Sequence, residues 1–215
     1  MVKKLLVLGD SFCHGIGTAS VFKDPVNTEH AFGRHVADHL ELDYLNLAEP
    51  GSSVQRTVEV GYHYLSQHQQ NIDTVIVGWT NPARAGFYTQ ESMLQILPSY
   101  VLLGDHSDPD VFVEHKNNVK FITDKHNQQH LSTLPKLHKI MIENNFIDQT
   151  NTAGMLINLF RLWMDSQHIK YYDFSVFGHE FNTKLSVSFN NIMTPTRHPT
   201  ANEQQKFAEI LIQQL

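Results

Sequence analysis

Four short apolar runs, separated from one another by longer segments, constrain the fold of this chain more than any other feature. The runs span Lys4–Leu8, Tyr44–Leu47, Thr74–Val77 and Ile169–Phe174. Runs of this length and composition are typical of buried β-strands. Because helical patterns fill the segments between them, the alternation predicts an α/β fold with a central parallel sheet.

One helix is predicted between the second and third runs. Ser52 and Ser53 are available as its N-cap, because a serine side chain can accept a hydrogen bond from the first turn of a helix. Its apolar residues recur at spacings of four, four and three, which places them on one face. These residues are Val54, Val58, Tyr62 and Leu65.

Two further helices are predicted toward the C-terminus. The first precedes the fourth run, with Thr152 as its N-cap. Its apolar stripe is formed by Met155, Leu156, Leu159, Phe160 and Trp163. The second covers Asn202–Leu215, and its inward side is formed by Phe207, Ile210 and Leu211. Right-handed crossovers would distribute these helices over both sides of the sheet.

The length of the chain and one irregular stretch define its domain organisation. A chain of 215 residues fits a single domain, and 41% hydrophobic and 18% charged residues are typical of a globular protein. From Pro82 to Thr150 the regular alternation is interrupted by a polar stretch rich in His, Asn and Gln. We predict one domain over residues 1–215, with an insertion of mixed short helices at about 82–150 that caps the carboxyl edge of the sheet.

Charge and cysteine content narrow the possible partners and compartment. A formal net charge of −6 without a Lys/Arg-rich stripe argues against nucleic-acid binding, which depends on phosphate neutralisation. Cys13 is the only cysteine, so no intrachain disulfide can form and a reducing compartment is expected. The apolar run Leu5–Leu8 is too short for a signal peptide or a membrane span. We expect a soluble, cytoplasmic protein that needs no metal or organic cofactor, with the 14 histidines on a solvated surface.

The first apolar run ends in a turn that carries a serine. Its sequence is Gly9-Asp10-Ser11-Phe12-Cys13-His14-Gly15. A hydroxyl group at this turn would face the carboxyl edge of a parallel sheet, where ligands bind in such folds. Alternatively, Gly-Asp-Ser is an ordinary turn in which Asp10 caps its own backbone.

Three other residues follow predicted elements at the same edge. Gly51 precedes a helix and can offer a backbone N–H, and Asn81 follows the third run with a side-chain amide. Both types of donor can stabilise developing negative charge. His198 introduces the final helix, and an imidazole there can take a proton from Ser11 at neutral pH.

Ser11, Gly51, Asn81 and His198 occur in the order of the SGNH (GDSL-like) hydrolases, a family that the chain resembles from Val2 to about Thr89 and from about Ala153 to its end. The chain also resembles SGNH-like proteins of bacteriophages. The resemblance implies a flavodoxin-like three-layer α/β/α fold and acyl transfer. It implies that Ser11 is the nucleophile, that His198 is its base, and that the Ser11 backbone N–H, Gly51 and Asn81 form the oxyanion hole.

Two blocks of the sequence depart from the family pattern. The third block usually reads Gly-x-Asn-Asp; here Asn81 matches if the alignment has no gap, whereas an alignment on Gly78 puts Thr80 in its place. The last block usually has an aspartate three residues before the histidine, where this chain has Pro195. A backbone carbonyl near Thr194 or a carboxylate such as Asp173 could orient His198 instead.

The predicted function is therefore a carboxylic ester hydrolase that uses Ser11 and His198 on an ester of a small molecule, lipid or acylated sugar. The alternative is a catalytically weakened binding module of the same fold that recognises an acylated ligand or a protein partner. A nucleotide binder is disfavoured, because no GxGxxG or GxxxxGK[ST] sequence follows Gly9. A Cys–His hydrolase with Cys13 is a minor alternative.

The remaining assignments concern residues after the third run. Trp79, Phe87 and Tyr88 could line an acyl or sugar pocket, but we interpret them as core residues. Arg84 could contact a substrate carboxylate, but pairing with a nearby acid is the preferred interpretation.

Overall fold

The computed structural model describes residues 3–18, 26–82, 85–88, 93–96, 149–178, 181–193 and 197–215. Within these ranges, only the backbone is described at 26, 85–88, 93–96, 149 and 150. Most of the predicted insertion and the family-motif position of Pro195 therefore lie outside the described residues.

A parallel sheet forms the centre of the molecule. Its strands are β2 (Asp43–Asn46), β1 (Lys4–Leu8), β3 (Ile72–Trp79) and β6 (Tyr171–Ser175), in that order. Every neighbouring pair is parallel, with Leu6 opposite both Leu45 and Val75. The strand order corresponds to 2-1-3-4 along the chain, as in flavodoxin-like sheets. The prediction of a parallel α/β sheet is confirmed.

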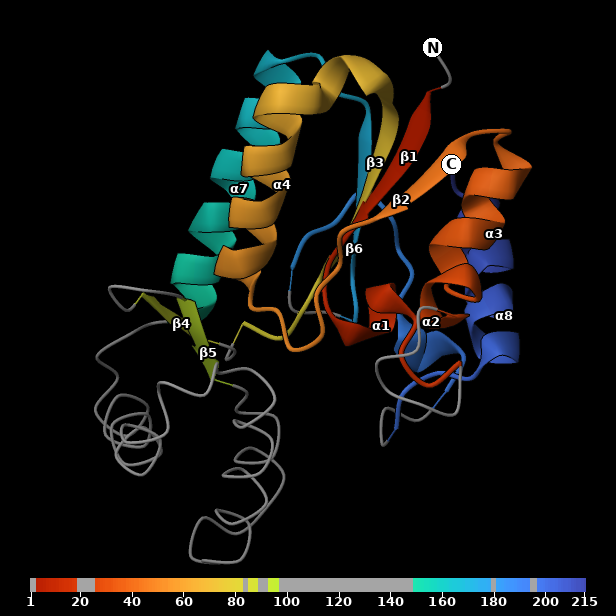
Figure 1. Cartoon of the computed structure of the whole chain (residues 1–215). Helices are drawn as coiled ribbons and strands as arrows, with labels where there is room; N and C mark the ends of the chain where they lie inside the picture. Colours follow the sequence, from red (N-terminus) through yellow and green to blue (C-terminus); the bar gives the residue numbers. More distant parts are fainter. Residues whose placement is uncertain are drawn as a thin grey trace, which may run out of the picture.

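Helices cover both faces of this sheet (Figure 1). On one face lie α3 (Phe32–His39) and α8 (Ala201–Ile212), and on the other lie α4 (Val54–His68) and α7 (Gln149–Ser166). The molecule is thus a three-layer α/β/α structure. Shorter helices complete it: α1 (Ser11–His14), α2 (Val26–Glu29), and the 3-10 helices η1 (Gln69–Asn71) and η3 (Phe189–Asn191).

Each face of the sheet has its own apolar core because side chains of a strand alternate between faces. The first core lies under α3 and α8 and includes Val7, Phe32 and Phe207. The second lies under α4 and α7 and includes Leu8, Trp79 and Phe160. The two cores share the strands but none of their core side chains.

Two details of the predicted helices are wrong. Helix α7 begins at Gln149, so Thr152 is an internal residue of the helix and not its N-cap. Met155 and Leu159 were predicted on the inward stripe, but both are 56% exposed, whereas Ile157 and Met164 are buried. The inward face of α7 is therefore rotated from the predicted one, because Ala153, Ile157, Phe160 and Met164 fit the second core.

A β-hairpin replaces the expected short helices in the described part of the insertion. Strand β4 (Ala85–Tyr88) pairs antiparallel with β5 (Met93–Ile96). The hairpin lies beside the lower ends of α4 and α7 in Figure 1. The role of the insertion as a cap stays a prediction.

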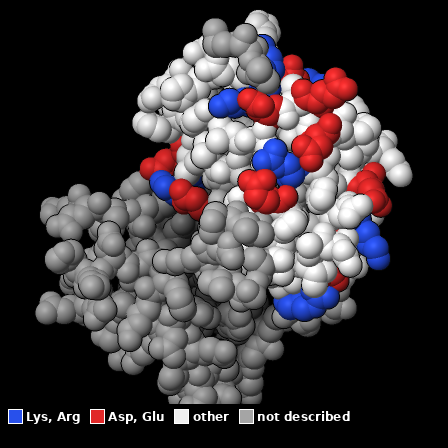
Figure 2. Space-filling view, turned by 45° about the vertical axis from the view of Figure 1, so that its right-hand side comes forward, with Lys and Arg blue, Asp and Glu red and all other residues white. Residues whose placement is uncertain are grey.

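Charged side chains of opposite sign lie next to one another on the surface shown in Figure 2. Independently of that view, ion pairs join Arg34 to Glu29 at 2.9 Å and Arg56 to Glu49 at 2.8 Å. Among the helices that the structure describes, none combines the length and apolar character that a membrane span requires.

Candidate active site

The turn after β1 fixes the position of Ser11. Asp10 is the N-cap of α1, and its Oδ1 accepts a hydrogen bond from the Phe12 backbone N–H at 2.9 Å. Gly15 ends the helix with φ 91°, a left-handed conformation that glycine adopts without strain. Ser11 is consequently the first residue of a one-turn helix at the carboxyl end of the first strand.

The second carboxylate oxygen of Asp10 is held by the residue that follows β3. Thr80 Oγ1 donates a hydrogen bond to Asp10 Oδ2 at 2.9 Å, and both side chains are fully buried. Because a buried carboxylate is costly unless it is hydrogen-bonded, these donors stabilise the turn. The Asp10 carboxylate is therefore held by hydrogen bonds from α1 and from the residue that follows β3.

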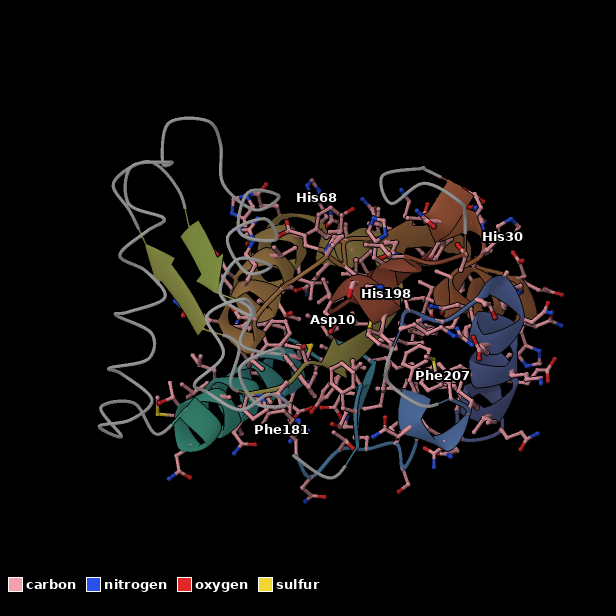
Figure 3. The ribbon with its side chains drawn as sticks, turned by 90° about the horizontal axis from the view of Figure 1, so that it is seen from below. Asp10, His30, His68, Phe181, His198 and Phe207 are labelled. Carbon is pink, nitrogen blue, oxygen red and sulfur yellow. The ribbon has the colours of Figure 1, made fainter. Side chains whose placement is uncertain are left out.

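His198 and Ser11 lie within hydrogen-bond distance, although 187 residues separate them in the chain. His198 Nε2 is 2.9 Å from Ser11 Oγ. In Figure 3, which views the molecule from the carboxyl edge of the sheet, His198 and Asp10 lie near the middle. Ser11 is only 6% exposed and His198 is half-buried. The geometry allows the imidazole to exchange a proton with the hydroxyl group.

The segment that carries His198 is held at several points. Thr200 is the N-cap of α8 and forms a reciprocal capping box with Glu203. Arg197 also forms two hydrogen bonds to Glu203, at 2.7 and 2.8 Å. This interaction lowers the pKa of Glu203 to about 2, with further lowering by hydrogen bonds from Thr200. The segment therefore enters α8 in a defined conformation.

Two neighbours pack directly against His198. The Phe12 ring lies 5.4 Å from the imidazole, measured between ring centroids. Gly17 has φ 95°, and a Cβ atom added there would lie 2.8 Å from the Cβ of His198. The absence of a side chain at Gly17 thus leaves the space in which the His198 segment lies.

The Gly51 loop lies at the same edge of the sheet, between β2 and α4. Gly51 has φ 80°, and Ser53 caps α4 by accepting a hydrogen bond from the Arg56 N–H. Glu49 anchors the loop because its N–H donates to Gly9 O at 3.0 Å and its carboxylate accepts two hydrogen bonds from Arg56. The loop is therefore tied to the turn that carries Ser11.

Thr80 and Asn81 are the two residues that could take the asparagine's place in the third block. The Thr80 hydroxyl group donates to the buried Asp10 carboxylate, so the alternative that puts Thr80 in the asparagine's role is disfavoured. Asn81 follows it, half-buried, at the carboxyl edge. Trp79 is fully buried in the second core, as its interpretation as a core residue requires. Arg84 and the side chains of Phe87 and Tyr88 lie outside the described residues.

Asp173 does not orient His198. Its carboxylate accepts hydrogen bonds from Trp79 Nε1 at 2.7 Å, Arg161 Nε at 2.7 Å and the Lys184 N–H at 2.9 Å. Tyr171, two residues before Asp173 on β6, packs in the second core, so Asp173 points to the face covered by α4 and α7. His198 instead lies two residues before Thr200, the N-cap of α8, which covers the other face. Asp173 therefore links β6 to Trp79 and α7, and the alternative in which it orients His198 is wrong. Thr194 and Pro195 lie outside the described residues.

Cys13 is a core residue. It is fully buried in the first core, and its Sγ lies against the backbone of Gly9 and Gly78, where an added Cβ atom would collide with it. This position does not suit a nucleophile, which disfavours the Cys–His alternative.

The described residues also bear on metal binding. His35 and His39 lie one turn apart on α3, a spacing that metal sites often use. Nowhere in the described ranges do three or more His, Cys, Asp or Glu side chains gather as metal ligands would. The histidine pair of α3 is therefore not part of a metal site formed by described residues.

Gln204 is a residue near the site that the sequence analysis missed. It is fully buried and its side chain contacts the backbone next to Ser11. A signal was present: Gln204 precedes Phe207 and Leu211 by three and seven positions, which places a polar residue on the apolar face of α8.

The comparisons with known proteins give structural likeness only. No protein-family model matches the chain, and no curated protein matches it. Similar solved structures include the psychrotrophic esterase EstA from Pseudoalteromonas sp., at 11% identity over 99% of this chain and 96% of that chain with a TM-score of 0.39. The lipase Lip_vut3 from a goat rumen metagenome has 14% identity over 99% of this chain and 97% of that chain with a TM-score of 0.41.

A third similar structure is longer than this chain. The acetyl xylan esterase Est2A from the rumen bacterium Butyrivibrio proteoclasticus has 11% identity and a TM-score of 0.42, covering 98% of this chain and 63% of that chain. At this degree of likeness, the activities of these proteins do not transfer to this chain.

Proposed function

We propose that this protein is a serine hydrolase of the SGNH type that cleaves carboxylic esters through an acyl-enzyme on Ser11. The observation that carries the proposal is the 2.9 Å distance between Ser11 Oγ and His198 Nε2 at the carboxyl edge of a parallel sheet. A nucleophile and a base within hydrogen-bond distance are the minimal machinery for acyl transfer.

In the first half of the reaction, Ser11 Oγ bonds to the ester carbonyl carbon while His198 Nε2 accepts the hydroxyl proton. The carbonyl oxygen becomes an oxyanion. When the tetrahedral intermediate collapses, the bond to the alcohol oxygen breaks and His198 gives that oxygen its proton. The acyl group stays on Ser11. Water then repeats the sequence, with His198 as its base, and releases the carboxylic acid.

The oxyanion hole is proposed to consist of the Ser11 N–H, the Gly51 N–H and the Asn81 amide. The positive φ of Gly51, 80°, and the anchoring of its loop to Gly9 support a fixed backbone donor. The half-buried position of Asn81 directly after the buried Thr80 supports a side-chain donor at the same edge. Fixed donors of this kind contribute about 10²-fold or more each to turnover.

The group that orients His198 is proposed to be a backbone carbonyl near Thr194. This choice is supported by the hydrogen bonds that Asp173 accepts from Trp79 and Arg161, because Asp173 was the alternative carboxylate for orienting His198. Without an orienting carboxylate, turnover is expected to be about 10⁴-fold below that of a complete triad and still above the uncatalysed rate. The binding module is the second candidate, and the proline at position 195 is the observation that favours it.

The test is hydrolysis of p-nitrophenyl esters of increasing chain length, with labelling by a fluorophosphonate probe. Wild type should turn over and label, whereas Ser11→Ala should lose both and His198→Ala should lose at least about 10³-fold in kcat/KM. Ser66→Ala and His63→Ala, on the exposed side of α4, are matched controls that should behave as wild type. A folded wild type that neither turns over nor labels would favour the binding module.

A further inference from the structure

The side chain of Gln204 connects three elements at the back of the candidate site. Its Nε2 donates a hydrogen bond to Phe12 O at 2.8 Å, and its Oε1 accepts one from the Phe32 N–H at 2.9 Å. The side chain is fully buried. It therefore joins α8 to the residue after Ser11 and to the first residue of α3.

Both hydrogen bonds have a fixed direction. A carbonyl oxygen only accepts and a backbone N–H only donates, so one orientation of the Gln204 amide satisfies both partners. The bond to Phe32 also replaces a missing cap, because Ala31, the N-cap residue of α3, provides no side-chain hydrogen bond. A buried amide is costly when unpaired, so α8 has a preferred position in which both bonds form.

The aromatic contacts of α8 with α3 and η3 do not require a fixed donor and acceptor geometry. Phe207 stacks on Phe189 at a centroid distance of 4.0 Å and meets Phe32 edge to face at 5.1 Å. Apolar contacts of this kind stabilise the packing but tolerate small shifts. Two hydrogen bonds to backbone atoms define the position of α8 more narrowly than aromatic packing does.

We infer that Gln204 is a positioning residue that sets the distance between His198 and Ser11 by fixing α8 on the Phe12 peptide group. The inference rests on the proposed function. His198 lies six residues before Gln204, and the Thr200 capping box and the Arg197–Glu203 pair hold the intervening segment. A shift of α8 would therefore move the imidazole relative to Ser11 Oγ.

Two substitutions and one matched control test this role. Gln204→Met keeps the length of the side chain and removes both hydrogen bonds. Gln204→Glu keeps the shape: a protonated carboxyl can accept from Phe32 and donate to Phe12 O, whereas the ionised form cannot donate. Gln205→Met changes the next residue of α8, which is exposed, and serves as the control.

The kinetic expectation separates positioning from support of the fold. Gln204→Met should lower kcat by about 10- to 100-fold while KM stays within about 3-fold, because misplacement of about 1 Å disrupts the reacting geometry. Gln204→Glu should retain more activity near pH 6 than near pH 9, relative to wild type, as its carboxyl group loses the donor proton. Wild-type kcat in a folded Gln204→Met, or no pH-dependent loss in Gln204→Glu, would overturn the inference.

A spectroscopic measurement decides the inference even if no ester is hydrolysed. The His198 imidazole ¹⁵N signals, assigned with His198→Ala, should shift in Gln204→Met in the same direction as in Ser11→Ala and stay unchanged in Gln205→Met. If wild type is inactive but this shift occurs, the proposed function fails and the positioning role holds. If wild type is active and the signals do not move, the positioning role fails alone. If Gln204→Met does not fold, the same comparison is made with Gln204→Glu at both pH values.

Discussion

At the scale of single residues, Gly17 combines a left-handed backbone with close packing against His198. Its φ is 95°, and an added Cβ atom would lie 2.8 Å from His198 Cβ and 2.9 Å from Pro199 O. Gly17→Ala should therefore destabilise the protein by about 1–3 kcal/mol and lower kcat, because either the turn or the His198 segment must move. Urea unfolding and ester hydrolysis measure the two effects.

Gly154 provides the matched control for that substitution. It lies within α7, and an added Cβ atom would meet no atom within 4 Å. Gly154→Ala should leave kcat unchanged and raise the free energy of unfolding by about 0.5–1 kcal/mol, since alanine is the better helix former. If Gly17→Ala folds and keeps the wild-type kcat, its contact with His198 has no role in placing the imidazole.

The sequence predicted the proximity of Ser11 and His198 but not the partners of the buried polar groups. The carboxyl ends of parallel strands meet at one edge, so order along the chain was enough to bring the two residues together. Asp173 also stands near the end of a strand, but its face depends on the strand's alternation, which turns it toward Trp79 and Arg161. The hydrogen-bond partner of a single side chain can therefore be predicted only when the strand register is known, and packing defines that register.

At the scale of elements, α7 presents buried and exposed aliphatic side chains on opposite sides. Ile157 is 1% exposed in the second core, whereas Leu159 is 56% exposed. Ile157→Ala should lower the free energy of unfolding by about 2–5 kcal/mol, and Leu159→Ala should change it by no more than about 0.5 kcal/mol. Urea unfolding of both variants checks this. Equal losses would contradict the orientation of α7.

The ion pair at the start of α8 should make the free energy of unfolding depend on pH in the acidic range. The Arg197 guanidinium is the main cause that lowers the pKa of Glu203 from 4.5 to about 2. Because the folded-state pKa is depressed, the stabilisation is complete above about pH 4.5 and is lost as the pH falls toward 2. Arg197 is 54% exposed, so solvent and salt screen the pair.

The measurement compares the unfolding free energy of wild type and Glu203→Gln across that range. Wild type should be more stable than the variant near pH 6, and the difference should shrink near pH 2.5. Glu209→Gln, an exposed acid farther along α8, is the control and should show little change in its difference from wild type. A Glu203→Gln difference that is constant with pH would contradict the pairing with Arg197.

The elements that the sequence missed have weak local signals. Helix α3 was not predicted because its buried residues, Phe32, Gly33, Val36 and Ala37, form a narrow face among histidines and charged residues. Gly33 is needed there for another reason: an added Cβ atom would lie 2.6 Å from Val7 Cγ2. The start of α7 was misplaced because Thr152 has the chemistry of a cap, although Ala153 continues the buried face within the helix.

At the scale of the whole molecule, the insertion joins the body of the protein between β3 and α7. The four strands of the parallel sheet and the described helices on both its faces lie outside residues 97–148 in the sequence. Replacing residues 97–148 by a short Gly/Ser linker should therefore leave a folded body that still labels at Ser11 with a fluorophosphonate. The preference for ester chain length should change, because connections at the carboxyl edge of a sheet commonly set what binds. An unchanged preference in a folded variant would contradict a role in substrate choice.

The overall architecture followed from the sequence because it depends on repeated local patterns. The four predicted strands correspond to β1, β2, β3 and β6; β1 has its predicted bounds, and the other three differ by one to two residues at each end. The hairpin of β4 and β5 did not follow, because its strands are four residues each and lie in a polar stretch without a regular period.

The separation of the two cores has a consequence for how such a protein can change through evolution. Phe12, next to Ser11, and the helix behind His198 both pack into the first core, while the insertion is bordered by β3 and α7, whose Trp79 and Phe160 pack in the second. The segment can therefore be lengthened, shortened or exchanged during evolution with changes in packing confined to the second core. The distance between Ser11 and His198 depends on the first core, on the other side of the sheet, and would be preserved.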